Sequence, residues 1–151
     1  MTQWHHKSFD QLNVTELYDI LKLRQDVFVI EQQCIYPELD DTDQTAMHLY
    51  AYIDGKIAAY ARLFAPGIKY AQSAIGRVVI HPSARGGGLG KDVMVESIQA
   101  LERDYPDAGI KISAQLYLQA FYEGLGFVLD SEPYDDEGIM HIDMVKAPVA
   151  I

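Results

Sequence analysis

The stretch Ile75–Lys91, which reads IGRVVIHPSARGGGLGK, decides the fold. A strand-like run ends just before Pro82, Arg85 follows, and four of the five positions 86–90 are glycine. Apolar residues at helical spacing come next. Each glycine gives up side-chain contacts and costs backbone entropy on folding. A turn with so many glycines indicates that something approaches the backbone closely enough to exclude side chains.

The residues on both sides of this turn predict further strands and helices. Asn13, with Glu16 three residues later, is typical of a helix start. Asp54-Gly55 between two strand-like runs is the strongest short signal for a hairpin. We expect strands at 4–9, 46–53, 56–64, 75–80, 110–116, 127–130 and 139–145. We expect helices from the Asn13 cap to about Phe28, at 88–104 and within 117–126.

The order of these elements predicts the fold class. The strand at 75–80, the helix at 88–104 and the strand at 110–116 form a right-handed parallel crossover. The remaining strands read as antiparallel neighbours. No repeat, low-complexity stretch or linker interrupts the chain. We therefore expect an α/β fold with a mixed sheet in a single domain, 1–151.

Bulk properties exclude several classes of function. The formal net charge of −10 disfavours broad binding to nucleic acid. No run approaches the roughly 20 apolar residues of a membrane span, and the N-terminus lacks a basic-then-apolar signal segment. One cysteine, Cys34, fits a reducing compartment. The histidines show no zinc spacing, so we expect no bound metal. The lack of a signal segment and of a membrane span leads us to expect a cytoplasmic protein without a membrane partner.

Two common phosphate motifs fail at the glycine turn. A P-loop requires glycine where Arg85 stands and serine or threonine where Asp92 stands. The dinucleotide fingerprint requires glycine where Lys91 stands. What remains is an arginine and bare backbone at a helix N-terminus, an arrangement that suits an anion. A protein that binds ATP or GTP is therefore disfavoured.

Two motifs resemble the GNAT N-acetyltransferase family. Arg85-Gly-Gly-Gly88-Leu-Gly90 resembles the family's pyrophosphate-binding turn, and Phe121-Tyr122-x-x-x-Gly126-Phe127 resembles its second motif. Together they cover about residues 74–128, and the second follows the next parallel strand as the family requires.

A narrower resemblance, to the ElaA branch of the family, extends over most of the chain. It rests on LRxxVFVxEQ at residues 23–32, on Pro37 and Asp40, and on the stretches AMHL and AYARL.

The resemblance implies a fold, a cofactor and a set of cofactor-binding residues. The fold would be a mixed, mostly antiparallel sheet flanked by helices, with a central parallel pair splayed to admit acyl-CoA. The acyl donor would most naturally be acetyl-CoA, whose pantetheine arm would pair with strand backbone and whose pyrophosphate would bind the turn. A backbone N–H near Val79 or Ile80 would stabilise the oxyanion. The implied cofactor-binding residues are Val78, Val79, Ile80, Arg85, Gly86, Gly87, Gly88, Leu89, Gly90, Lys91 and Gln115.

The resemblance also implies direct attack of a primary amine on the thioester. Tyr122 matches the family's acid, which protonates the leaving thiolate. Glu31 is the first candidate for the general base, followed by Asp40, Asp41, His48 and an ordered water. The acidic run ELDDTD favours a solvated surface over steering of a cationic amine. Arg24 and Arg62 are expected to be ion-paired supports.

Three questions stay open from the sequence. A non-catalytic module that senses acyl-CoA is the alternative to an enzyme. The substrate amine, which the acidic chain would favour as a cation, is a small molecule or a protein. A homodimer is possible.

Overall fold

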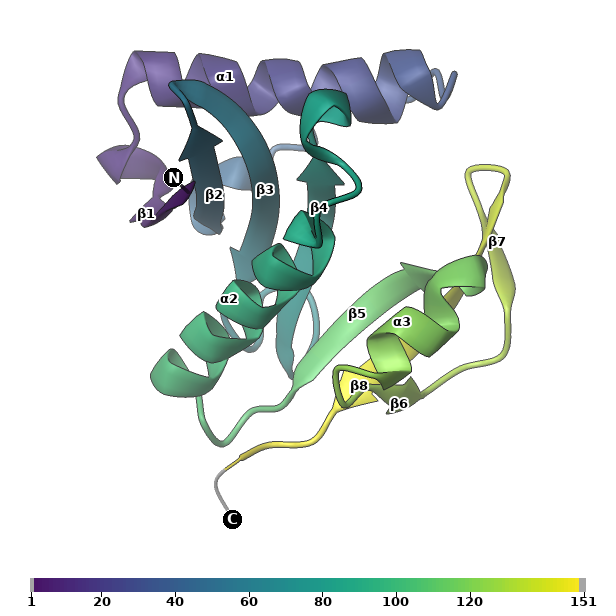
Figure 1. Ribbon diagram of the computed structural model, residues 1–151. Coiled ribbons are helices and arrows are strands. Elements are labelled where there is room, and N and C mark those ends of the chain that lie inside the picture. The colour runs from purple at the N-terminus through teal and green to yellow at the C-terminus, as the bar shows by residue number, and fades with distance from the viewer. Residues whose placement is uncertain (1, 150–151) are drawn as a thin grey trace. The chain divides into compact units, whose positions relative to one another are not determined.

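The computed structural model describes residues 2–149, and its elements follow the expected order (Figure 1). The α-helices are α1 (Val14–Arg24), α2 (Leu89–Asp104) and α3 (Gln119–Glu123). The strands are β1 (Thr2–Ser8), β2 (Met47–Ile53), β3 (Lys56–Phe64), β4 (Ser73–Ile80), β5 (Ile110–Gln115), β6 (Val128–Leu129), β7 (Tyr134–Asp136) and β8 (Ile139–Lys146). Short helical turns are η1 (Phe9–Gln11), η3 (Asp43–Thr45), η4 (Pro82–Ala84) and η5 (Leu116–Leu118), and η2 (Gln25–Glu31) is π-helical.

The sheet is mixed, as the sequence predicted. Its strand order is β1-β2-β3-β4-β5-β8-β6, and β7 also pairs with β8. Strand β4 pairs in parallel with β5, joining Ser73 to Ile110 and Ala74 to Lys111. The neighbours β1/β2, β2/β3 and β5/β8 are antiparallel. The mostly antiparallel sheet with one parallel pair confirms the predicted fold class.

The chain divides into two compact units. The first contains the chain up to Leu63 together with Arg77–Ser97, and the second contains Phe64–Gly76 and the chain from Ile98 onward.

The first unit has a core between its first helix and its strands. Ile20 and Leu23 of α1 pack with Tyr50 of β2, Tyr60 of β3 and Val79 of β4, all buried. The predicted helix start is confirmed, because the Asn13 side chain accepts from the Glu16 N–H at 2.8 Å while Glu16 accepts from the Asn13 N–H at 3.0 Å. The predicted hairpin is confirmed as well. Asp54 and Gly55 connect β2 to β3 with φ values of 52° and 77°.

The first helix extends beyond its expected end near Phe28. It continues as the π-helix η2 to Glu31. The N–H groups of Gln32 and Cys34 bond five residues back, to the carbonyls of Val27 and Val29. Such wide turns are rare and concentrate at functional sites. The apolar spacing of the sequence does not distinguish them from ordinary helix.

The second unit contains β5, β6, β7, β8 and α3. A strand that the sequence did not predict, β7, pairs with β8 through Tyr134 and His141. Its residues, Tyr-Asp-Asp, lack the alternation of a half-buried strand. Glu137 and Gly138, with φ of 54° and 85°, form the tight turn that holds β7 against β8.

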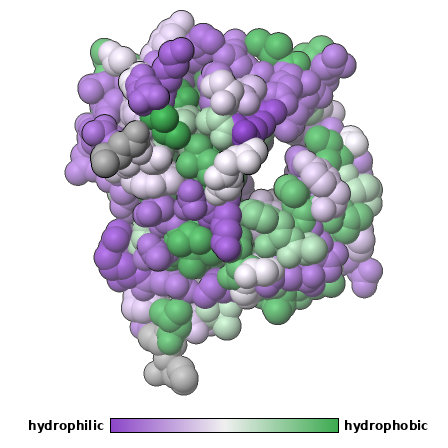
Figure 2. Space-filling model, in the orientation of Figure 1, coloured by the Kyte–Doolittle hydropathy of each residue, from purple (hydrophilic) through white to green (hydrophobic). Residues whose placement is uncertain are grey.

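No helix within residues 2–149 is long and apolar enough to cross a membrane. Polar residues cover much of the face in Figure 2, with apolar residues in separate groups.

Candidate active site

The glycine turn leaves its backbone open to solvent. Gly86 and Gly88 have φ values of 90° and 84°, a region that glycine adopts without strain. A Cβ atom added at Gly87 would meet no atom within 4 Å, and Gly87 does not have a positive φ. The conformation of the chain thus explains two of the glycines, whereas no contact within the protein requires Gly87. Its small size is consistent with the close approach of a ligand.

The turn leads directly into the N-terminus of α2. The Asp92 N–H donates to the Gly88 carbonyl at 3.1 Å, which is the first hydrogen bond of the helix. The N–H groups of the first turn, from Leu89 to Lys91, therefore precede any intrahelical acceptor and carry partial positive charge. This end of the helix can bind an anion.

Two predicted site residues contact each other. Arg85 donates from Nη1 and Nη2 to the two carboxylate oxygens of Glu31, at 2.7 and 2.9 Å. Its Nε donates to the carbonyl of Ile80 at 3.2 Å. The side chains are 42% and 44% exposed, so both remain accessible. The hydrogen bonds from Arg85 lower the pKa of Glu31, which makes this carboxylate a weaker base than an isolated glutamate.

The end of β4 carries the residues expected to pair with the cofactor. Val79 is buried in the core of the first unit, while Val78 and Ile80 are half-buried. Arg77, just before them, has a φ of 49° inside the strand, a conformation that non-glycine residues rarely adopt and that marks a local break in strand geometry. Its guanidinium lies 4.6 Å from the centre of the Phe28 ring and its Nε lies 3.1 Å from Glu38. No sequence pattern predicts this strained arginine, apart from the glycine that precedes it.

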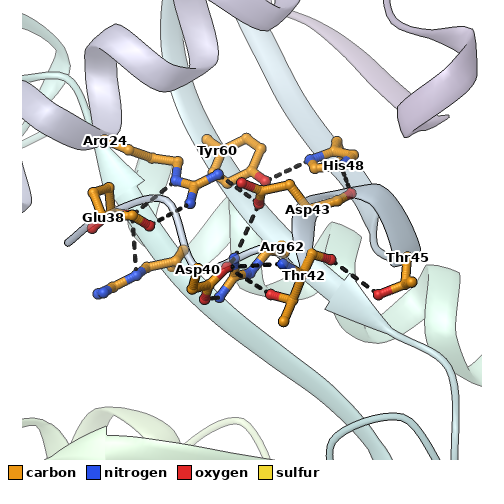
Figure 3. A network of polar contacts seen from close by, with 10 residues as sticks. Arg24, Glu38, Asp40, Thr42, Asp43, Thr45, His48, Tyr60 and Arg62 are labelled. Carbon is orange, nitrogen blue, oxygen red and sulfur yellow. Dashed lines mark hydrogen bonds and ion pairs between the residues drawn. The ribbon is translucent and has the colours of Figure 1, made fainter.

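The acidic loop is not simply a solvated surface. Figure 3 shows three of its carboxylates, those of Glu38, Asp40 and Asp43, turned toward two buried arginines, whereas Asp41 is exposed. Arg24 donates to Glu38 at 2.9 Å and to Asp43 at 2.8 Å. Arg62 donates to Asp43 at 3.0 Å and to both oxygens of Asp40 at 2.9 and 2.8 Å. We call these five residues the buried arginine network. It confirms the ion-paired state expected for both arginines. It corrects the expectation of a solvated run for the side chains of Glu38 and Asp43, which are buried, whereas that of Asp40 stays 39% exposed.

The network also argues against two candidate bases. Although partial burial favours its neutral form, hydrogen bonds from Arg62 and Thr42 hold the pKa of Asp40 well below its usual range. His48 is fully buried, and burial lowers its pKa. Its Nε2 contacts the Asp43 carbonyl at 2.9 Å and its Nδ1 contacts the Tyr60 hydroxyl at 2.6 Å. A carbonyl only accepts, so Nε2 donates and Nδ1 accepts, leaving no ring nitrogen to take a proton from a substrate.

Tyr122 and Gln115 both lie in the second unit. The Tyr122 ring meets the rings of Phe121 and Phe127 edge to face, at 5.1 and 6.1 Å between centroids. Burial raises the pKa of Tyr122 to about 12, so the phenol stays protonated at neutral pH. Gln115 is the last residue of β5, is half-buried, and pairs with His141 of β8.

No group of three or more histidine, cysteine or acidic side chains between residues 2 and 149 is placed to hold a metal ion.

The comparison with protein families decides the assignment. The acetyltransferase (GNAT) domain matches residues 16–148. The chain belongs to the GNAT acetyltransferase family. This confirms the resemblance carried by the glycine turn and by the Phe121-Tyr122 motif.

Individual GNAT relatives cover nearly the whole chain. A crystal structure titled as an acyl-CoA N-acyltransferase from Pseudomonas aeruginosa matches with a TM-score of 0.94 and 43% identity, covering 97% of this chain and 100% of that one. ElaA from Escherichia coli is 33% identical over 97% of both proteins, and its crystal structure matches with a TM-score of 0.91, covering 97% of this chain and 99% of that one. A UPF0039 protein of Synechocystis is 38% identical over 94% of this chain and 93% of its own length. The predicted ElaA-like branch is confirmed.

Proposed function

We propose that this protein transfers the acetyl group of acetyl-CoA to a primary amine by direct attack, without an acyl-enzyme. The family and its fold support an acyltransferase that uses a CoA thioester. The observation that carries the proposal is the open backbone of the glycine turn, with Arg85 before it and the N-terminus of α2 after it. A pyrophosphate is the anion that this combination of donors suits.

The cofactor contacts follow from this placement. Arg85 and the N–H groups from Gly86 to Lys91 would bind the pyrophosphate. The backbone of Val78, Val79 and Ile80 would pair with the pantetheine arm, and one of its N–H groups would stabilise the oxyanion. Gln115 would contact the arm from β5. Arg85 must release Glu31 to use its guanidinium fork, so the cofactor competes with that carboxylate.

The leaving sulfur defines the role of Tyr122. Its pKa of about 12 keeps the hydroxyl protonated, so that it donates a hydrogen bond to the charge developing on sulfur. Complete proton transfer to a thiolate of ordinary pKa, about 8.5, is uphill from that value. Tyr122 therefore stabilises the thiolate by a hydrogen bond as the C–S bond breaks, and the thiolate then takes a proton from water, while the amine that forms the new C–N bond loses its proton to the base. The base is Glu31 once Arg85 has released it, or a water ordered near it.

Replacement of Tyr122 tests the proposal. Tyr122→Phe keeps the ring packing and loses only the hydroxyl, so acetyl-CoA affinity should be retained. Release of CoA thiol across a panel of amines should fall by about 10² to 10⁴ in kcat, the usual contribution of a positioned acid, with kcat/KM falling equally. A protein that only senses acyl-CoA would bind acetyl-CoA and release no thiol with any amine. Equal rates for both proteins would remove the acid role from Tyr122.

We further propose that the whole chain acts as one domain in the cytoplasm.

A further inference from the structure

A chain of hydrogen-bonded side chains crosses three strands of the second unit. The Ser113 hydroxyl on β5 lies 2.5 Å from the Tyr134 hydroxyl on β7. Tyr134 donates in turn to Asp143 Oδ1 on β8 at 2.6 Å. Ser113 and Asp143 face each other across the β5–β8 pairing. No sequence pattern predicts these contacts, because strand β7 is not among the expected strands.

The donors and acceptors in this chain of hydrogen bonds can be assigned from the groups that form it. A phenol has one proton, and Tyr134 gives it to Asp143. Burial and the hydrogen bond to Asp143 raise the pKa of Tyr134 to about 12, so that proton is held. Ser113 must then donate its own proton to Tyr134. Its hydroxyl is exposed to solvent with only lone pairs left to offer. Ser113 thus presents a hydrogen-bond acceptor, which suits a ligand that carries N–H groups.

The surrounding charges favour a cation. Lys111 lies 3.2 Å from Asp130 and 3.8 Å from Asp143, so one ammonium serves two carboxylates. Residues 130–145 contain six acidic residues and neither lysine nor arginine. The His141 ring stacks on the Tyr134 ring, with 6.2 Å between the centroids. An ammonium ion would be attracted here, whereas a carboxylate would be repelled.

The position of Ser113 on β5 connects this chain of hydrogen bonds to the proposed transferase reaction. Ser113 and Gln115 are two residues apart on a strand, so they lie on the same face, roughly 7 Å apart along it. Gln115 is the residue of β5 proposed to contact the cofactor. A molecule bound at Ser113 would therefore sit close to the arm that carries the acyl group.

We propose that Ser113, supported by Tyr134 and Asp143, binds the ammonium group of the substrate amine. Ser113 accepts a hydrogen bond from the ammonium N–H, while Tyr134 and Asp143 are positioning residues that keep the proton of the serine hydroxyl directed at Tyr134 and its lone pairs exposed. This assignment rests on the proposed function for the identity of its ligand, but the site itself can be tested without turnover.

The test uses two cations of equal charge as probes of the whole chain. Propylammonium has N–H groups, and tetramethylammonium has none. In amide NMR titrations, propylammonium should give saturable shifts at Ser113 and its β8 partner Asp143, in the millimolar range of dissociation constant. Tetramethylammonium should give smaller, unsaturated shifts from charge alone.

Three variants distinguish binding through the chain of hydrogen bonds from attraction to the acidic residues of 130–145. Ser113→Ala should weaken propylammonium binding by roughly three- to tenfold, the usual effect of one hydrogen bond. Tyr134→Phe should do the same by freeing the serine hydroxyl to rotate. Asp135→Asn is the matched control, because it removes one charge from the opposite face of β7 and should leave binding unchanged.

Two results would overturn the assignment. One is an equal response to the two cations, and the other is propylammonium binding that Ser113→Ala leaves intact. Thermal stabilisation by acetyl-CoA, measured in parallel, separates this inference from the proposed function. If acetyl-CoA stabilises the protein and no amine site appears, only the inference fails. If propylammonium binds and acetyl-CoA does not stabilise, the transferase proposal fails and the cation site stands.

Discussion

Arginine and carboxylate meet in two places in the first unit, with opposite consequences. In the buried arginine network, Arg24 is fully buried and bonded to Glu38 and Asp43. In the glycine turn, Arg85 and Glu31 form an equally short pair that is 42% and 44% exposed. A buried ion pair cannot exchange its partner without leaving a charge unpaired in a medium of low dielectric. An exposed pair contributes little to stability and can exchange its partner freely. The same chemistry therefore supports the fold in one place and remains available to a ligand in the other.

The largest effect is expected from breaking the buried pair. Arg24→Met removes the fully buried cation that Glu38 and Asp43 share and leaves Asp43 with Arg62 and Glu38 with Arg77. It should lower the free energy of unfolding by about 3 kcal/mol, the lower end of the cost of breaking a buried ion pair. Denaturant unfolding measures this change. Arg85→Met is the matched substitution in the exposed pair and should not differ from an ordinary surface replacement. Similar losses for both variants would end the distinction between the two regions.

The next effect concerns cofactor affinity. Arg85→Ala should weaken acetyl-CoA binding by about 1.5–3 kcal/mol, roughly ten- to a hundredfold in Kd, because a charge-assisted hydrogen bond to phosphate is lost. Calorimetric titration measures the affinity. Arg103→Ala serves as the control, because it removes a cation whose side chain is 65% exposed and pairs with the neighbouring Asp104. Unchanged affinity in Arg85→Ala would mean that the pyrophosphate binds elsewhere.

The smallest effect comes from the other half of the exposed pair. Glu31→Gln removes the carboxylate that competes for Arg85, so acetyl-CoA should bind more tightly than to the unaltered protein. This gain in affinity should be smaller than the loss in affinity caused by Arg85→Ala. The pH dependence has a definite sign. Arg85 lowers the pKa of Glu31, so competition is present above that pKa and disappears as pH falls through it. The two proteins should converge at acidic pH. Weaker binding in Glu31→Gln would show that the carboxylate assists the cofactor.

The sequence predicted the features that short stretches determine. The Asn13 cap, the Asp54-Gly55 hairpin and the glycine turn before α2 each depend on neighbouring residues, and the structure confirms them. The rest of the expected site was predicted from the two family motifs, because a motif is recognised by the spacing of its residues and not by their contacts.

Contacts between distant residues could not be predicted. Glu31 and Arg85 are 54 positions apart. The sequence around either residue does not indicate that the candidate general base forms an ion pair with the candidate phosphate-binding arginine. The acidic loop looked solvated because its arginine partners come from α1 and β3. The chain from Ser113 to Asp143 depends on β7, whose polar residues lack the pattern of a strand.

The most direct measurement is acetyl-CoA binding to Gly87→Val. Gly88 is a poorer choice, because its φ of 84° would strain any side chain. Gly87 lacks a positive φ and faces open space, so valine should leave the melting temperature of the free protein unchanged. The account predicts that calorimetry and thermal shift then detect no acetyl-CoA binding, since the new methyl groups occupy the place of the phosphates. A folded Gly87→Val protein with normal acetyl-CoA affinity would contradict the account.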